Sequence, residues 1–169
     1  METALSEMDR GLTESISATR NLSRDLSPII HQDEGLADAL TRLSTQMQKQ
    51  YTLSVALEMD GVKADLDENV NVVVLQAVRE LLFNVVKHAE TLQAAVNLEQ
   101  VDGQIRIIVN DEGKGFDSVA VMSNSGIAHG LLNIRQHLEL VECRMEIRSS
   151  PGNGTHVIIH TPNLVKLEH

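Results

Sequence analysis

A long helical pattern between Asp67 and His88 constrains this chain more than any other stretch. Its apolar residues recur at steps of three and four, which is the period of one buried helix face: Val70, Val73, Val74, Ala77, Leu81, Val85 and Ala89. Polar residues recur at the same steps along a neighbouring stripe: Gln76, Glu80, Asn84, Lys87 and His88. One edge of the helix is therefore core, while the other presents a carboxylate, an amide, an ammonium and an imidazole. Such a stripe is either a solvated surface or part of a site, and the rest of the chain decides between them.

Composition limits the classes of partner. The chain has 169 residues, which suits one domain with an extra helix or tail, and with 42% hydrophobic but only 2% aromatic residues its core is aliphatic. The formal net charge of −10 argues against nucleic acid or an anionic membrane surface as the main partner, so any phosphate must be held by local groups. The single cysteine, Cys143, excludes an internal disulfide and a cysteine-based metal cluster. No apolar run approaches about 18 residues, and we expect neither a membrane span nor a signal peptide.

The first part of the chain predicts two helices separated by a proline. The first covers 3–26, and Ser27-Pro28 ends it because the residue before proline avoids the helical region. The second, capped by Asp33 or Asp38, has a buried stripe formed by Leu36, Ala39, Leu40, Leu43 and Met47. The last three residues, 167–169, look like the start of a purification tag. We therefore expect a helical segment over 1–26, a domain over 27–163 and a tail over 164–169.

Alternating apolar residues predict five strands in the remaining chain. They cover 51–59, 94–98, 105–109, 145–149 and 155–161. Asp102-Gly103 is a strong hairpin signal between the second and third of these strands. Residues 117–128 show no period and predict a mobile loop, and Gly130 opens another helix.

A polar, glycine-rich segment follows the third strand, where a ligand site is often found. Asp111-x-Gly113-x-Gly115 is by itself also an ordinary turn, and neither the phosphate-loop nor the dinucleotide pattern occurs. A carboxylate at a strand end can accept a hydrogen bond from an exocyclic amine, and glycines let the backbone approach a flat ring. Gly126-x-x-x-Gly130 then leads into a helix start, where free N–H groups attract phosphate.

Taken in order, these motifs resemble the ATP-binding catalytic domain of bacterial sensor histidine kinases, of the Bergerat or GHKL fold. Among these kinases the chain is most similar to those that pair with LuxR-type response regulators. Four motifs carry the resemblance: Glu80-x-x-x-Asn84-x-x-Lys87-His88-Ala89 for the N box, Asp111-x-Gly113-x-Gly115-Phe116 for the G1 box, Gly130-Leu131-x-x-Ile134-Arg135 for the second glycine box, and Ser149-x-Pro151-Gly152-x-Gly154-Thr155 for the closing motif. The similarity covers roughly Leu26 to Pro162. It implies an α/β (α+β) two-layer sandwich, with a mixed, mostly antiparallel sheet, helices on one face and a preceding N-terminal helix.

The resemblance also implies ATP and Mg²⁺ as cofactors and assigns roles to the motif residues. Glu80 is the expected catalytic residue, which polarises the imidazole of a phosphoacceptor histidine. Asn84 is the expected Mg²⁺ ligand, and Asp111 is expected to recognise the adenine amino group. The other expected nucleotide-binding residues are Lys87, His88, Gly113, Gly115, Phe116, Gly126, His129, Gly130, Leu131 and Thr155. Residues 117–129 would form the ATP lid.

Two substitutions and one absence set this chain apart from the family pattern. Glu142-Cys143 stands where paired glycines are frequent, and Glu112 stands where Asn is frequent. The phosphoacceptor His-Asp or His-Glu pair is absent from the sequence, and 3–26 resembles only the second helix of the dimerisation hairpin. His31 lies on the wrong side of that helix to be the acceptor. We therefore expect a catalytic fragment that binds ATP but does not phosphorylate itself.

The expected partners follow from the same resemblance. They are ATP or ADP, the phosphoacceptor helix of the same kinase and a LuxR-type response regulator, without nucleic acid. The intact parent would be a homodimer, and this part of it would lie in the cytoplasm, whether or not the parent is attached to a membrane. Two alternatives stay open: a nucleotide-binding interaction module without catalysis, and a serine kinase of the anti-sigma-factor type with the same fold.

Overall fold

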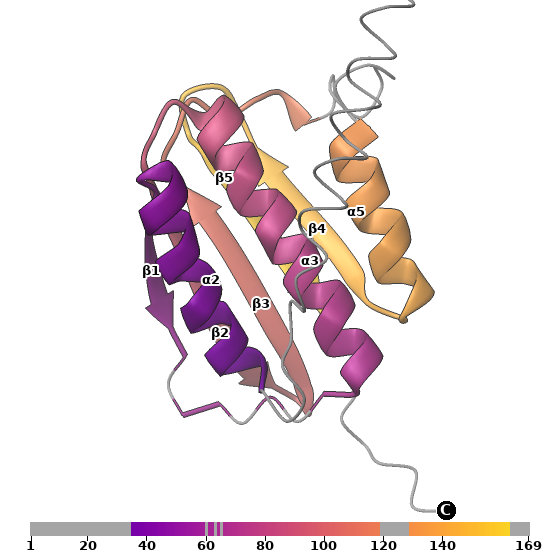
Figure 1. The fold of residues 1–169 in the computed structure, drawn as a ribbon. Helices are drawn as coiled ribbons and strands as arrows, with labels where there is room; N and C mark the ends of the chain where they lie inside the picture. The colour runs from indigo at the N-terminus through magenta and orange to yellow at the C-terminus, as the bar shows by residue number, and fades with distance from the viewer. Residues whose placement is uncertain (1–34, 60, 63, 65, 119–128, 163–169) are drawn as a thin grey trace, which may run out of the picture. The chain divides into compact units, whose positions relative to one another are not determined.

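The structure is a computed structural model, and it describes residues 35–59, 61, 62, 64, 66–118 and 129–162, with only the backbone of His129. The chain divides into two compact units, Met1–His31 and Gln32–His169. The helix expected over 3–26 and most of the expected lid lie outside the described residues. In the part of the second unit that the structure describes, helices cover one face of a five-stranded sheet (Figure 1).

The elements follow the order that the sequence predicts. They are α2 (Leu36–Tyr51), β1 (Ser54–Glu58), α3 (Glu68–Asn84), η1 (Val85–Ala89), β2 (Gln93–Val101), β3 (Gln104–Asp111), α5 (His129–Leu140), β4 (Arg144–Ser149) and β5 (Thr155–His160). The turn at Asp102-Gly103 has positive φ at both residues, as a tight hairpin between β2 and β3 requires. The expected fold class, a two-layer sandwich with a mixed sheet, is confirmed.

The sheet has five strands in the order β1-β2-β3-β5-β4. β1 pairs with β2 in parallel, and the other three pairings are antiparallel. The register places Asp111 opposite Thr155, and Thr155 opposite Ser149 on the next strand. Two glycine-rich loops far apart in the sequence, after β3 and before β5, therefore meet at one end of the sheet.

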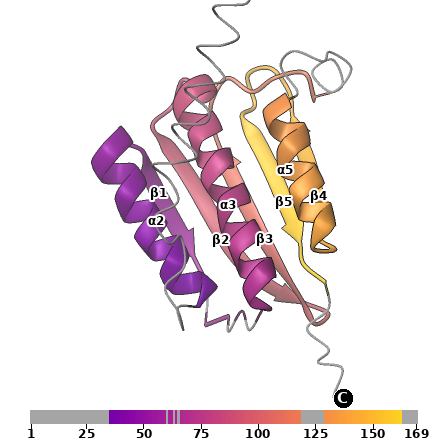
Figure 2. The same cartoon turned by 45° about the vertical axis from the view of Figure 1, so that its right-hand side comes forward.

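The core lies between the sheet and the helices, which cover the same face in both views (Figures 1 and 2). Every second side chain of a strand points into this core, and on β3 these are Ile105, Ile107 and Val109, which are all buried. α3 and η1 together, Glu68–Ala89, are long and apolar enough by composition to cross a membrane, with a mean hydropathy of 1.3. Here this segment is the central core helix, because its apolar face packs on the sheet.

The start of α2 differs from the prediction. Gly35 takes the N-cap position without a side-chain hydrogen bond, and Asp38 lies inside the first turn. An acidic side chain there interacts favourably with the positive end of the helix, which explains why its position resembled a cap signal. The buried stripe of α2 is the predicted one: Leu36, Ala39, Leu40, Leu43 and Met47.

The turn after α5 shows how the chain manages without paired glycines. Glu142 adopts a left-handed conformation with φ of 58°, and Cys143 N donates to Leu138 O at 2.9 Å to close the helix. Cys143 is buried, and this burial raises the pKa of its thiol from 9.0 to about 11. Glu142 therefore occupies the left-handed turn position at which glycine is usually favoured, and the turn still forms.

Candidate functional site

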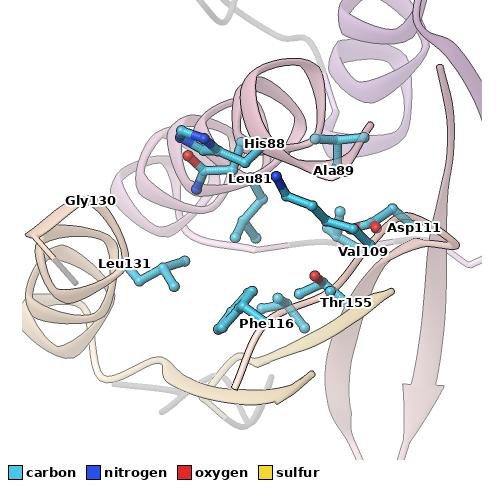
Figure 3. Close-up of a pocket in the computed structure, with 14 residues that line it drawn as sticks. Leu81, His88, Ala89, Val109, Asp111, Phe116, Gly130, Leu131 and Thr155 are labelled. Carbon is cyan, nitrogen blue, oxygen red and sulfur yellow. The ribbon is translucent and has the colours of Figure 1, made fainter. Parts of the chain in front are cut away.

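A cavity of about 420 Å³ opens between α3, α5 and the sheet. Its volume is within the range of about 300–1,000 Å³ that ligand pockets usually have. Four segments of the chain line it: the end of α3 with η1, the end of β3 with the loop after it, the start of α5, and β5 (Figure 3). The lining residues are Leu81, Asn84, Val85, His88, Ala89, Val109, Asp111, Lys114, Gly115, Phe116, Gly130, Leu131, Thr155 and Val157.

Eight predicted site residues meet in this cavity. They come from all four motifs and are Asn84, His88, Asp111, Gly115, Phe116, Gly130, Leu131 and Thr155. Asp111 and Thr155 lie toward one end, and Gly130 and Leu131 lie across the cavity from them (Figure 3). Gly126 and the His129 side chain lie outside the described part of the chain.

Lys87 occupies a different place from the one expected. Its Nζ lies 5.6 Å from the centroid of the Phe83 ring, and Lys87 is not among the lining residues. Lys87 follows Phe83 by four residues and lies over its ring, whereas His88 follows Asn84 by four residues and lines the cavity with it. Both residues belong to η1, a π-helix at the end of α3.

Glu80 also lies outside the cavity lining. It is an exposed residue on α3, one turn before Asn84 on the same side of the helix. A carboxylate in this position is accessible to a group that approaches from outside the domain, next to whatever Asn84 holds inside it.

The loop after β3 is bound to the end of η1 through its backbone. Gly113 N donates to Asp111 Oδ1 at 2.8 Å, and Lys114 N donates to Ala89 O at 2.8 Å. A Cβ at Gly113 would collide with the Ala89 carbonyl, which is why the position needs glycine although it does not line the cavity. The hydrogen bond from Gly113 fixes the Asp111 side chain, and no described residue bonds to its second carboxylate oxygen.

The turn before β5 supports the same loop from the other side. Ser149 Oγ accepts from Phe116 N at 2.9 Å and donates to Gly154 O at 2.7 Å. Gly154 has φ of 66°, and a Cβ there would collide with Asp111 O. The closing motif therefore positions both the Asp111 backbone and Phe116.

Sequence reasoning missed several lining residues. Lys114 was treated only as a spacer between two glycines, yet it lines the cavity and its Nζ pairs with Glu90 at 2.9 Å. The apolar lining, Leu81, Val85, Val109 and Val157, was predicted only as core. The strand and helix periods do place these residues on the inner face, but periodicity does not indicate which part of that face is left open.

The arrangement suits an amphipathic ligand with a flat apolar part. Apolar side chains form the walls, a carboxylate stands at one end, and an amide and an imidazole stand on α3 and η1. Among the described residues, no group of three or more His, Cys, Asp or Glu side chains could hold a metal ion. The oxygen of the Asn84 amide is suited to a hard cation that receives its other ligands from water and phosphate.

Comparison of the sequence with known proteins identifies the family. Residues 69–165 match the family described as "Histidine kinase-, DNA gyrase B-, and HSP90-like ATPase". The sensor histidine kinase ComP of Bacillus subtilis (strain 168) is 28% identical over 150 residues, which cover 89% of this chain and 19% of ComP. An uncharacterized sensor-like histidine kinase of Chloroflexus aurantiacus is 30% identical over 148 residues, or 85% of this chain and 25% of the relative. The chain thus spans a quarter or less of the length of these two relatives.

A solved structure shows the same fold. The histidine kinase domain of the Erythrobacter litoralis EL346 blue-light activated histidine kinase matches with a TM-score of 0.62 and 23% identity. The match covers 76% of this chain and 61% of that domain.

Proposed function

The chain belongs to the family of histidine kinase-, DNA gyrase B- and HSP90-like ATPases as an ATP-binding domain of the sensor histidine kinase kind, and on that premise we propose that it transfers the ATP γ-phosphoryl group to a histidine. The accepting histidine belongs to a dimerisation helix of the same kinase. The observation that carries the proposal is that Asn84 and Asp111, from separate motifs, line one cavity with Glu80 one turn outside it.

Adenine binds at the end of the cavity that holds Asp111. Its second carboxylate oxygen accepts a hydrogen bond from the adenine amino group, while Gly113 N holds the first oxygen. Thr155, paired with Asp111 across the sheet, assists nearby. Val109, Val157 and Phe116 supply apolar contacts for the ring.

The transfer itself requires positioning and charge more than acid–base chemistry. Asn84 would hold Mg²⁺ through its amide oxygen, and the cation would supply positive charge to the phosphates; His88 would contact the phosphates or ribose. Glu80 accepts a hydrogen bond from the acceptor imidazole, which strengthens the other ring nitrogen as a nucleophile. The N–P bond forms as the bond between the γ-phosphorus and the β–γ bridging oxygen breaks, and ADP leaves.

The partners proposed for the whole protein are those expected of a sensor histidine kinase. They are the acceptor helix, a second copy in a homodimer and a LuxR-type response regulator. Residues 1–26 would be part of the dimerisation hairpin, 27–163 the kinase domain and 164–169 a tail. The domain would work on the cytoplasmic side.

The test measures transfer of labelled phosphate from ATP with Mg²⁺ to an added fragment that carries the acceptor histidine. We expect acid-labile label on that fragment, and Glu80→Gln should reduce the rate by about 100-fold because the imidazole loses its proton acceptor. ATP affinity, measured by calorimetry, should change little because Glu80 lies outside the cavity.

Glu139→Gln is the matched control, because Glu139 is an exposed carboxylate at the far end of α5 from the cavity. It should leave both transfer and ATP affinity unchanged. Label on serine would indicate a serine kinase, and ATP binding without any transfer would indicate an interaction module; either result overturns the proposal.

A further inference from the structure

Arg135 on α5 carries a charge that the described structure leaves without a partner. The residue is half-buried, and its Nε is buried with no hydrogen-bond partner. No ion pair joins Arg135 to another described residue. A partly buried guanidinium without an anion costs stability, since burial removes water that no hydrogen bond replaces.

The position of Arg135 relates it to the cavity. Leu131 lines the cavity, and Arg135 follows it four residues later on the same side of α5. Arg135 does not line the cavity itself, but long side chains on a helix lean toward its N-terminus, which brings the turn that holds Leu131 within reach of a guanidinium at this position. This start of α5 lies beside the end of α3, where Asn84 and His88 are (Figures 1 and 2).

The other nearby cations are already engaged. Lys87 lies over the Phe83 ring, and Lys114, the only permanently charged cation among the described lining residues, pairs with Glu90. Residues 119–128 contain no Lys or Arg in the sequence. A polyphosphate bound at the α5 end of the cavity therefore has few sources of positive charge in a chain whose net charge is −10.

We propose that Arg135 is a further nucleotide-binding residue that pairs with the polyphosphate of ATP at the α5 end of the cavity. A guanidinium suits this role, because its planar donors match two phosphate oxygens at once. The inference rests on the proposed function and adds to it a residue whose partner is the phosphate chain, not the base.

Binding of ATP and of adenosine to Arg135→Gln, compared by calorimetry, separates the phosphate from the base. ATP affinity should fall by about 10-fold or more, which corresponds to the net value of one charged hydrogen-bonded contact. Adenosine affinity should stay the same, because adenosine lacks the phosphates. Arg135→Lys keeps the charge without the planar donors, and it should recover part of the ATP affinity.

Arg144→Gln is the matched control, because Arg144 is an exposed arginine on β4 and its loss changes the net charge equally. It should leave ATP affinity unchanged. Equal ATP affinity in wild type and Arg135→Gln, or an equal loss for ATP and adenosine, would overturn the inference. If the wild-type protein binds no adenine nucleotide at all, the proposed function fails instead.

Discussion

At the scale of single residues, the Asp111 carboxylate has one oxygen that is bonded and one that is not. One oxygen accepts from Gly113 N within its own loop, and no described residue bonds to the other, which the proposed function assigns to the adenine amine. The register opposite Thr155 and the backbone contact with Gly154 keep this residue at the cavity end. The carboxylate is thus oriented before any nucleotide arrives, and binding does not have to order it.

Asp111→Asn is expected to remove adenine recognition while it preserves the loop. The amide oxygen still accepts from Gly113 N, so the amide nitrogen, a donor, replaces the acceptor that faces the adenine amine. A donor left facing a donor costs about 1–3 kcal/mol, and ATP affinity should fall by roughly 10–100-fold. The preference for ATP over inosine triphosphate, measured by competition, should also disappear.

The control for this substitution is Asp102→Asn, in the hairpin turn between β2 and β3. Asparagine suits a turn residue with positive φ, so both the fold and ATP affinity should be retained. If Asp111→Asn kept the full preference for ATP over inosine triphosphate, Asp111 would not be the residue that reads the base.

At the scale of elements, the end of α3 near the cavity departs from what the sequence pattern predicts. The periodicity of α3 continues to Ala89, and nothing in it marks the change to π winding at Val85. The end of η1 is bound to a segment distant in sequence, because Lys114 N donates to Ala89 O. The period of three and four predicts the helix, but it does not show that Lys87 lies over the Phe83 ring and outside the cavity lining.

The end of α5 offers a stability prediction. Glu142 holds a left-handed conformation, which costs a residue with a Cβ roughly 1–2 kcal/mol. Glu142→Gly removes this strain, and after the greater entropy of glycine in the unfolded chain the free energy of unfolding should rise by about 0.5–1 kcal/mol. Urea denaturation followed by circular dichroism measures the change.

Gln136→Gly provides the opposite case, because Gln136 is an exposed residue inside the same helix. It should lower the free energy of unfolding by about 1 kcal/mol, as glycine does in a helix interior. If Glu142→Gly lowered stability by a similar amount, the left-handed conformation would not be a source of strain at this turn.

At the scale of the whole molecule, the sequence predicted the fold better than it predicted the site. Strand alternation, the Asp102-Gly103 turn and the long apolar helix define the elements and their order. The cavity depends on where the inner face is left unfilled, and this is a result of packing between distant segments. Lys114 illustrates the difference, because it lines the cavity and pairs with Glu90, a residue that the sequence does not place beside it.

The four histidines whose side chains the structure describes, His88, His137, His156 and His160, lead to a last prediction, that this chain does not phosphorylate itself. His156 and His160 alternate with the buried Val157 and Ile159, so they lie on the open face of the sheet, away from the helices and the cavity. His137 is exposed at the far end of α5 from the cavity. His88 lines the cavity one turn after Asn84, where the proposed function assigns it to the phosphates or ribose and not to the acceptor role.

Incubation of the chain alone with labelled ATP and Mg²⁺ should therefore give no stable, acid-labile label, whereas an added acceptor fragment should become labelled under the same conditions. A competent acceptor must approach Glu80 from outside, because this exposed carboxylate stands one turn from the cavity lining. Acid-labile phosphate on the chain alone would contradict the prediction. Its loss in His88→Gln would then identify His88 as an acceptor, and the helix that carries Asn84 would have to move relative to the bound nucleotide.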